Sequence, residues 1–249
     1  MLAALAHVWH ADVLTHERRG ADVAVFTCRP RRPLPFRAGQ HVTIECAYQP
    51  WQSRSYAIAN APRRDGILEF HVRTSAGSRL GQDSGAPNRS GSPSVSCALV
   101  DRLKPGDVLS LGAPAGSMAL DPYSRRDVVF VTGGTGLARA KALIDELSRV
   151  NRTRWIHLFR GERRRDGFYD RENVDRLVER HPWLTVIRAT SDEPDEQGTQ
   201  ATIPEVVTHH GPWPDHDFYV CGSSPMVAAT IRQLDRLQVP MARIHRAPE

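Results

Sequence analysis

The chain has 249 residues, of which 40% are hydrophobic and 24% charged, with a formal net charge of +5. This length suits two domains rather than one, and the composition excludes a disordered or fibrous protein. The sequence shows no run of about 18 uncharged apolar residues and no basic start followed by a long apolar stretch. We therefore expect a cytoplasmic protein without a membrane span or a secretion signal.

The positive charge favours an acidic partner or an anionic ligand, but the arginines are scattered and no nucleic-acid-binding motif accompanies them. We therefore expect no nucleic-acid partner. The four cysteines are too widely spaced for a CxxC pair or an iron–sulfur cluster, and the eleven histidines lack metal-site spacing. We predict no metal site.

The first half of the chain, to about Leu120, alternates short apolar runs with turn residues such as Gly66 and Pro105. This pattern is typical of antiparallel β-sheet. A helix is expected only around residues 96–103, so the sequence predicts a small β-barrel with one helix. The runs are ADVLTHE, DVAVFTCRP, HVTIECA, RSYAIANAP, ILEFHVRTS and DVLSLGAP.

From Arg126 the pattern changes to strand, glycine turn and helix, repeated along the chain. Alternating β and α segments predict a doubly wound parallel sheet with crossover helices. A charged helical stretch is expected near residues 170–179. We place the first domain at residues 1–122 and the second at residues 123–249. The stretches are DVVFVTGGTGLARAKALIDELSRV, WIHLFRG, LTVIRATS and DFYVCGSSPMVAATIRQLDRL.

The segment before the helix of the first domain has an unusual composition. Between Ser75 and Ser96, 13 of the 22 residues are Ser, Gly or Pro, and no apolar periodicity survives. Such segments form surface connections rather than packed elements. We predict a mobile surface loop over about residues 75–95.

An arginine and an aromatic residue stand two residues apart, at Arg54 and Tyr56, in one of the predicted strands. Side chains at positions i and i+2 of a strand point to the same face. The guanidinium could therefore hold a phosphate while the ring covers a flat ligand. A surface arginine beside a packing tyrosine is the alternative, and this peptide alone does not decide between them.

A glycine-rich turn, Thr132-Gly133-Gly134-Thr135-Gly136, follows an apolar strand and precedes a helix. Glycines let the backbone approach a pyrophosphate, and the helix N-terminus supplies free N–H groups and a positive dipole. The turn is not a strict GxGxxG, so a plain tight turn is the alternative.

A second strand–turn–helix unit contains Cys221, Gly222 and Met226 late in the chain. In a doubly wound sheet, turns of this kind lie at the carboxyl ends of the strands, where ligands bind. Cys221 could face a nicotinamide ring. The alternative is a small buried residue that closes the strand.

These three peptides, in this order and in a barrel followed by an α/β domain, resemble the ferredoxin-NADP reductase superfamily. Its pattern is Arg-x-Tyr-Ser/Thr for the flavin, Gly-Gly-Thr-Gly for the nicotinamide nucleotide and Cys-Gly-x-x-x-Met near the end. The resemblance runs from His10 to His245 and is greatest to the FAD/NAD(P)-binding reductase half of bacterial flavohaemoglobins and globin-coupled reductases. It implies an N-terminal FAD-binding barrel and a C-terminal NAD(P)-binding domain.

The resemblance also implies a function, that of an FAD-dependent reductase. A hydride would pass from NADPH or NADH to the flavin, and the electrons would then go to an external acceptor. The sequence has no iron–sulfur cysteine set and no globin segment. The acceptor would therefore be a separate haem protein, a ferredoxin, free flavin or dioxygen.

For the flavin site, the resemblance implies that Arg54 binds the FAD phosphates and that Tyr56 packs against the isoalloxazine or its ribityl arm. Tyr56 and Ala57 would stand closest to the chemistry. The segment Val95-Ser96 would meet the pyrophosphate at the start of a helix. The other residues implied for FAD are Ser55, Ile58, His71, Val72 and Arg73.

For the nicotinamide nucleotide, the resemblance implies that Thr135 and Gly136 meet the pyrophosphate. Cys221, Gly222 and Met226 would lie near the nicotinamide, with Cys221 next to the chemistry. Tyr169 could stack on the adenine, and Arg163 or Arg164 could pair with a 2′-phosphate, which favours NADPH over NADH. A solvated basic loop is the alternative for these two arginines.

The chain departs from the family pattern in four places. Ala57 replaces a Ser or Thr expected near the flavin, and Arg139 replaces a proline common after the Gly-Thr-Gly turn. The loop before Ser96 is longer than usual, and the tail lacks the terminal aromatic residue of many relatives. These departures leave a second hypothesis open: a specialised biosynthetic or cofactor-binding flavoprotein with weak or lost reductase activity.

Overall fold

The chain folds into two compact units, Met1–Gly116 and Ser117–Glu249. The boundary expected from the sequence lies slightly later, after residue 122. The predicted loop at residues 75–95 lies outside the described residues except for Ser94 and Val95, and the last two residues of the tail also lie outside them. The structure is a computed structural model that describes residues 8–74, 94–151, 153–194 and 200–247.

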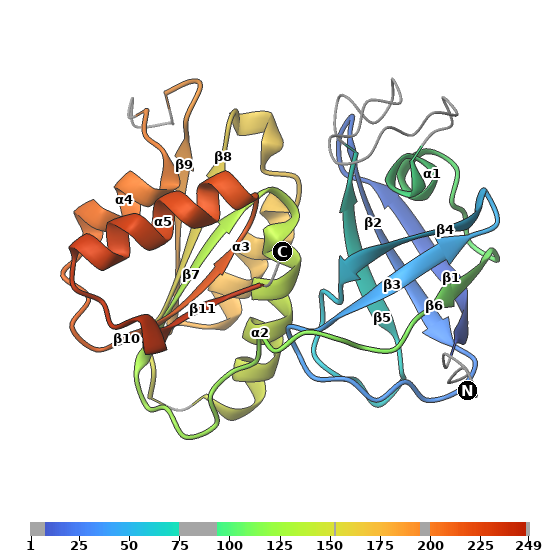
Figure 1. The fold of residues 1–249 in the computed structure, drawn as a ribbon, viewed down its shortest axis with the longest axis horizontal. Helices are drawn as coiled ribbons and strands as arrows, with labels where there is room; N and C mark the ends of the chain where they lie inside the picture. Colours follow the sequence, from blue (N-terminus) through green and yellow to red (C-terminus); the bar gives the residue numbers. More distant parts are fainter. Residues whose placement is uncertain (1–7, 75–93, 152, 195–199, 248–249) are drawn as a thin grey trace, which may run out of the picture. The chain divides into compact units, whose positions relative to one another are not determined.

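Six antiparallel strands form one curled sheet in the first unit (Figure 1). Their order is β4-β3-β6-β1-β2-β5, so β4 and β5 stand at the two ends of the sheet. The predicted antiparallel fold is confirmed, in the form of a half-barrel. The strands are β1 (Trp9–Arg18), β2 (Val23–Pro30), β3 (His41–Cys46), β4 (Gln49–Ala57), β5 (Leu68–Arg73) and β6 (Val108–Leu111).

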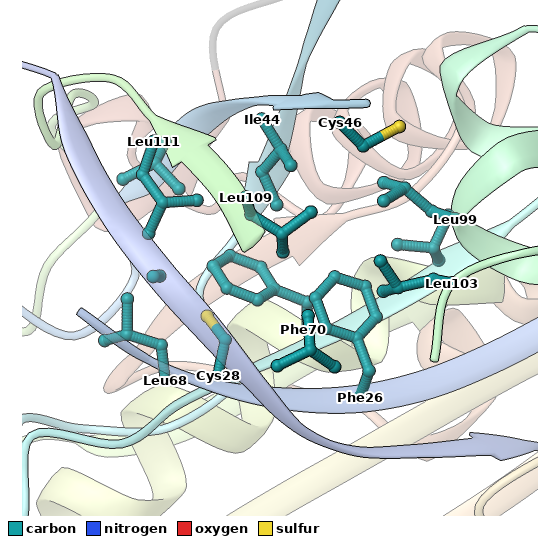
Figure 2. Packing of buried hydrophobic residues seen from close by; sticks show 14 of the residues in the cluster. Phe26, Cys28, Ile44, Cys46, Leu68, Phe70, Leu99, Leu103, Leu109 and Leu111 are labelled. Atoms are coloured by element: carbon teal, nitrogen blue, oxygen red, sulfur yellow. The ribbon is translucent and has the colours of Figure 1, made fainter. Parts of the chain in front are cut away.

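The concave side of this sheet is filled by an apolar core, which Figure 2 shows from close by. The rings of Phe26 and Phe70 lie at its centre, with centroids 5.3 Å apart. The helix α1 (Val95–Asp101) adds Leu99 to this core. Ser94 caps α1, because its hydroxyl accepts a hydrogen bond from the backbone N–H of Cys97 at 3.3 Å.

Five parallel strands form the sheet of the second unit, in the order β11-β10-β7-β8-β9 (Figure 1). The predicted parallel α/β class is confirmed. The strand β11 was not predicted, because three residues are too few to show a period. The strands are β7 (Asp127–Gly133), β8 (Ile156–Glu162), β9 (Leu184–Thr190), β10 (His216–Cys221) and β11 (Ile244–Arg246).

Helices cover both faces of the parallel sheet. Val129 and Val131 of β7 pack in one apolar cluster with residues of α4 and α5, whereas Phe130 between them points to the other face and meets Tyr219. No residue of α2 belongs to that cluster, although α2 contacts β7 and β10, so α2 lies on the opposite face. The helices are α2 (Leu137–Val150), α3 (Arg171–Arg180), α4 (Ile203–His210) and α5 (Ser224–Arg236).

The helix α4 was missed in the sequence analysis, although its start carries a recognisable signal. Thr202 and Glu205 form a capping box, in which the Thr202 backbone N–H donates to the Glu205 carboxylate at 2.8 Å. Pro204 stands in the first turn, where proline is tolerated. The helix is short, which is why its apolar period did not stand out.

The strand order fixes where this sheet can bind a ligand. From β7 the chain adds β8 and β9 on one side and later adds β10 on the other side. The order therefore reverses between β7 and β10. In open α/β sheets, ligands bind outside the carboxyl ends of the strands at this switch point. The two predicted glycine turns follow these two strands.

Two histidines lie against a buried tryptophan at the opposite ends of the strands. The rings of His157 and His216 lie 5.6 and 4.9 Å from the ring of Trp213, centroid to centroid. Burial lowers the pKa of both imidazoles, and in His157 a charge on His216 would lower it further. Asp127 acts in the opposite direction at both residues, so the net effect comes from burial.

This cluster predicts that acid destabilises the second unit. Below the ordinary histidine pKa of about 6.5, the unfolded chain takes up protons that the folded His157 and His216 resist. The free energy of unfolding should therefore fall as the pH drops from about 7 through this window. Thermal unfolding of wild type and of His216→Phe, measured from about pH 7 to below about pH 6.5, tests this loss of stability. The variant should lose less stability on acidification, and the exposed His209→Gln should behave like wild type.

Candidate functional site

Two backbone turns touch at the switch point of the parallel sheet. A Cβ atom added to Gly136 would lie 2.2 Å from the carbonyl oxygen of Cys221 and 2.6 Å from its carbonyl carbon. Cβ atoms essentially never come this close to non-bonded atoms, so any side chain at position 136 would force the backbone at Cys221 to shift. The turn after β7 and the turn after β10 are thus brought together at the carboxyl ends of their strands.

The first of these turns presents backbone donors and almost no side chains. Gly134 has a positive φ of 55°, which favours glycine, and residues 134–136 form a short 3₁₀ turn before α2. No side chain caps the start of α2. Thr135 is partly exposed on this turn. A helix N-terminus with free N–H groups and positive dipole suits a diphosphate.

Met226 closes the second turn from α5. Its Sδ would lie 2.6 Å from a Cβ on Gly133 and 2.9 Å from a Cβ on Gly222, so the thioether packs against both glycines. The predicted residues Gly136, Cys221, Gly222 and Met226 therefore lie in one cluster. Thioethers adapt to irregular gaps, which suits a residue between two backbone turns.

Cys221 ends β10 as a free and buried thiol. Its Sγ lies 3.4 Å from the Sδ of Met118. Burial raises the pKa of Cys221 to about 12, and Arg139 offsets this only in part. The thiol therefore stays protonated near neutral pH and is no thiolate nucleophile. What it can offer a ligand is a neutral, polarisable sulfur, since its S–H already donates to Met118.

The three arginines after β8 differ in what holds them. Arg164 pairs with Glu193 at 3.4 Å, and Arg165 donates to the carbonyl of Pro194 at 2.9 Å. Arg163 is exposed, and its guanidinium has no hydrogen-bond or ion-pair partner among the described residues. Of the two arginines predicted to meet a 2′-phosphate, Arg163 is therefore the one with its donors available.

The predicted adenine partner, Tyr169, is only 8% exposed. Its ring lies 5.7 Å from the guanidinium carbon of Arg160, which also lies 5.3 Å from the ring of Phe168. Phe168 is the more exposed of the two rings. Phe168 and Arg160 belong to the stretch of residues 159–169 that the resemblance implies for adenosine, but the sequence gave neither a role of its own. An aromatic neighbour of Tyr169 and an arginine inside an apolar strand form no motif.

In the first unit, the strand β4 carries the predicted flavin residues along the edge of the sheet. Its residues 50–55 are all exposed, including Arg54 and Ser55. Tyr56 is half-buried, and its hydroxyl lies 2.9 Å from the Oγ of Ser96 at the start of α1. Burial raises the pKa of Tyr56 to about 12, so the hydroxyl stays protonated and able to donate. The contact joins two segments that the sequence analysis had assigned to FAD.

Of the remaining predicted flavin residues, some have side chains buried in the apolar core and others have side chains in polar contacts or at the end of β4. Ile58, Val72 and Val95 lie in the apolar core of the unit, so only their backbone groups are left to meet a ligand. Ala57 is half-buried at the end of β4. His71 is buried, and its Nε2 lies 2.8 Å from the Oε1 of Glu69. Arg73 is also engaged, since its Nε lies 3.4 Å from Asp22.

These two residue sets fit the two nucleotides. The turn at residues 133–136 has no room for a Cβ at Gly136 and offers backbone donors, as a diphosphate requires. The strand β4 offers an exposed guanidinium at Arg54 and a hydroxyl pair at Tyr56 and Ser96, donors suited to phosphates and a flavin. Among the described residues, no group of three or more His, Cys, Asp or Glu is placed to hold a metal ion.

Comparison with known proteins matches each unit to a family. Residues 10–120 match the oxidoreductase FAD-binding domain family, and residues 130–232 match the oxidoreductase NAD-binding domain family. The chain therefore consists of a ferredoxin reductase-like pair of oxidoreductase FAD-binding and NAD-binding domains. The resemblance noted in the sequence is thereby confirmed, together with binding domains for FAD and for a nicotinamide nucleotide.

Several curated relatives of this ferredoxin reductase-like chain are named as reductase components. It is 30% identical over 208 residues to the phenol 2-monooxygenase reductase component DmpP of Pseudomonas sp. (strain CF600). The aligned region covers 82% of this chain and 54% of that protein. The chain is 31% identical over 224 residues to terephthalate 1,2-dioxygenase reductase component 1 of Comamonas sp., covering 87% and 61%. The chain thus spans little more than half the length of these relatives.

Solved structures show the same fold. The ferredoxin reductase in carbazole 1,9a-dioxygenase superposes with a TM-score of 0.82 at 26% identity, over 99% of this chain and 70% of the other. A flavohaem-like FAD/NAD-binding domain from Vibrio cholerae gives a TM-score of 0.80 at 22% identity, over 96% and 97%. Among the described residues, no helix is long and apolar enough to cross a membrane.

The contact between the two turns predicts a graded response to added methyl groups. In Gly136→Ala the new Cβ meets backbone atoms of Cys221, which cannot move without shifting β10. In Gly133→Ala it meets the flexible end of Met226. We expect Gly136→Ala to lose about 1–3 kcal/mol of unfolding free energy and most nucleotide affinity, and Gly133→Ala to lose less. Urea unfolding measures the free energy of unfolding, and NADPH titration measures the nucleotide affinity. Equal losses in the two variants would contradict the close contact of Gly136 with Cys221.

Proposed function

We propose that this chain is an FAD-dependent reductase that oxidises NADPH or NADH and passes the electrons to an external acceptor. The observation that carries the proposal is the contact of Gly136 with Cys221, which places two glycine turns at the switch point of a nucleotide-binding sheet. Held by the first unit, FAD would supply the redox chemistry, as the acceptor of a hydride from the reduced nicotinamide and the source of the electrons for the acceptor. The domains we propose are residues 1–122 for FAD and 123–249 for the nicotinamide nucleotide.

Each set of residues has a distinct task in this proposal. Arg54 holds the FAD phosphates, and the hydroxyl of Tyr56, fixed by Ser96, orients the flavin. The turn at residues 133–136 holds the diphosphate of the nicotinamide nucleotide. Cys221 stays neutral beside the nicotinamide and excludes water, so the protein aligns the reactants rather than acting as an acid or base.

The acceptor we propose is a protein, either a haem protein or a ferredoxin. The relatives named above are reductase components of a monooxygenase and a dioxygenase, which supports a protein partner. The net charge of +5 would attract an acidic one. We also propose a cytoplasmic location, because all four cysteines are free and buried, as in a reducing compartment.

One experiment separates this function from the alternative of a specialised flavoprotein with lost reductase activity. The purified protein is loaded with FAD, and its visible spectrum is recorded while NADPH or NADH is added without oxygen. Bleaching of the yellow colour by either nucleotide supports the reductase. A yellow protein bleached by neither favours the specialised flavoprotein, and a chain that cannot be loaded with FAD defeats both hypotheses.

Ala57 predicts that this reductase is slower than it could be. The family places a hydroxyl at this position, and a hydrogen bond to a group that gains charge during the reaction is worth about 1.5–3 kcal/mol. Ala57→Ser should therefore accelerate flavin reduction about ten- to a hundredfold in anaerobic stopped-flow mixing. Ala47→Ser, an exposed position in the turn between β3 and β4, is the matched control and should leave the rate unchanged. An unchanged rate in Ala57→Ser would show that no hydroxyl is missing.

The preference for NADPH is proposed to depend on Arg163. Arg163→Gln should lower kcat/KM for NADPH about tenfold or more, because a charged hydrogen bond to the 2′-phosphate is lost, and should hardly change kcat/KM for NADH. Arg164→Gln should have the smaller effect, since Arg164 already pairs with Glu193. If both nucleotides lose equally in Arg163→Gln, the arginine does not read the 2′-phosphate.

A further inference from the structure

A buried guanidinium with unused donors lies near the proposed adenosine end of the nucleotide site. Arg160 is 1% exposed, and its Nη1 and Nη2 have no hydrogen-bond partner among the residues the structure covers. Burial lowers the pKa of Arg160, although the nearby carboxylate of Glu162 offsets part of this. A buried charge without hydrogen bonds opposes folding, so its presence in an apolar strand calls for an explanation.

Arg160 lies near the carboxyl end of β8, between the two neighbouring strands β7 and β9. It pairs in register with Thr132 of β7, the first residue of the glycine turn, and with Arg188 of β9. Arg188 is also an arginine and lies directly beside Arg160 on the next strand. Unlike Arg160, it donates a hydrogen bond to a carboxylate, that of Asp175 in α3. The two arginines therefore form a natural pair for comparison, one with a carboxylate partner and one without.

The contacts that Arg160 does make are with the segment that follows β8. Its guanidinium carbon lies 5.3 Å from the ring of Phe168 and 5.7 Å from the ring of Tyr169, both within the range of cation–π attraction. The intervening turn closes tightly, since a Cβ on Gly167 would lie 2.8 Å from a carboxylate oxygen of Glu162. One planar cation thus supports two adjacent aromatic rings.

We propose that Arg160 is a positioning residue for the adenosine end of the nicotinamide nucleotide. Its guanidinium fixes Phe168 and Tyr169 and thereby sets the shape of the segment from Arg163 to Tyr169. This inference rests on the proposed function, which assigns that segment to adenosine. A planar, delocalised cation supports both rings in one orientation, which neither an apolar side chain nor the compact ammonium of lysine does.

Equilibrium binding of 2′,5′-ADP tests this role without the redox reaction, because this fragment carries the adenosine end and no nicotinamide. Calorimetric titration of the FAD-loaded protein compares wild type with Arg160→Met, Arg160→Lys and Arg188→Met. We expect the Kd to rise about tenfold or more in both Arg160 variants, since small displacements of a binding group are costly. In Arg188→Met the Kd should stay within about twofold of wild type, because among the described residues the guanidinium of Arg188 pairs with Asp175 and only that of Arg160 lies over the two rings.

Steady-state kinetics with NADPH add a readout that general loosening of the sheet would not give. In Arg160→Lys the loss should appear as a higher KM rather than as a lower kcat. Thermal unfolding and flavin content show which variants are folded, and Arg160→Lys carries the test if Arg160→Met does not fold. Wild-type affinity in a folded Arg160 variant, or an equal loss in Arg188→Met, overturns the proposal. A wild type that neither NADPH nor NADH bleaches refutes the proposed function instead, whereas one that NADH bleaches but that does not bind 2′,5′-ADP overturns the present proposal.

Discussion

The close approach of Gly136 to the carbonyl of Cys221 is the constraint on which the nucleotide site depends. It exists because the strand order reverses between β7 and β10, which sets the ends of two sequence-distant strands side by side. A methyl group at position 136 would force the two turns apart. The same lack of side chains that permits this contact leaves the backbone donors at the start of α2 open to an anion.

The flavin residues follow a different principle, that of an edge strand. An edge strand has one unpaired side, and β4 is exposed along residues 50–55. Its functional end is anchored at Tyr56, whose hydroxyl meets Ser96 of α1. The core around Phe26 and Phe70 holds the sheet and α1 together (Figure 2), so the exposed strand is presented by a rigid support.

Two buried polar groups in the second unit differ in charge: one is a neutral thiol and the other is a guanidinium. The thiol of Cys221 is kept neutral by burial, which suits a position beside a nicotinamide. The guanidinium of Arg160 keeps no hydrogen-bond partner at its Nη atoms among the described residues and meets aromatic faces instead. Local departures of this kind from the usual rules of burial are expected where a structure serves binding rather than stability.

The sequence alone determined the two-unit architecture and the order of its motifs, because periods of 2 and 3.6 residues and glycine turns are local signals. It missed α4 and β11, which are too short to display a period. It also named Tyr169 and Arg163 without their surroundings. Only the tertiary structure decided that Tyr169 is covered by Arg160 and that Gly136 touches Cys221, because both contacts join segments whose proximity comes from strand order and packing.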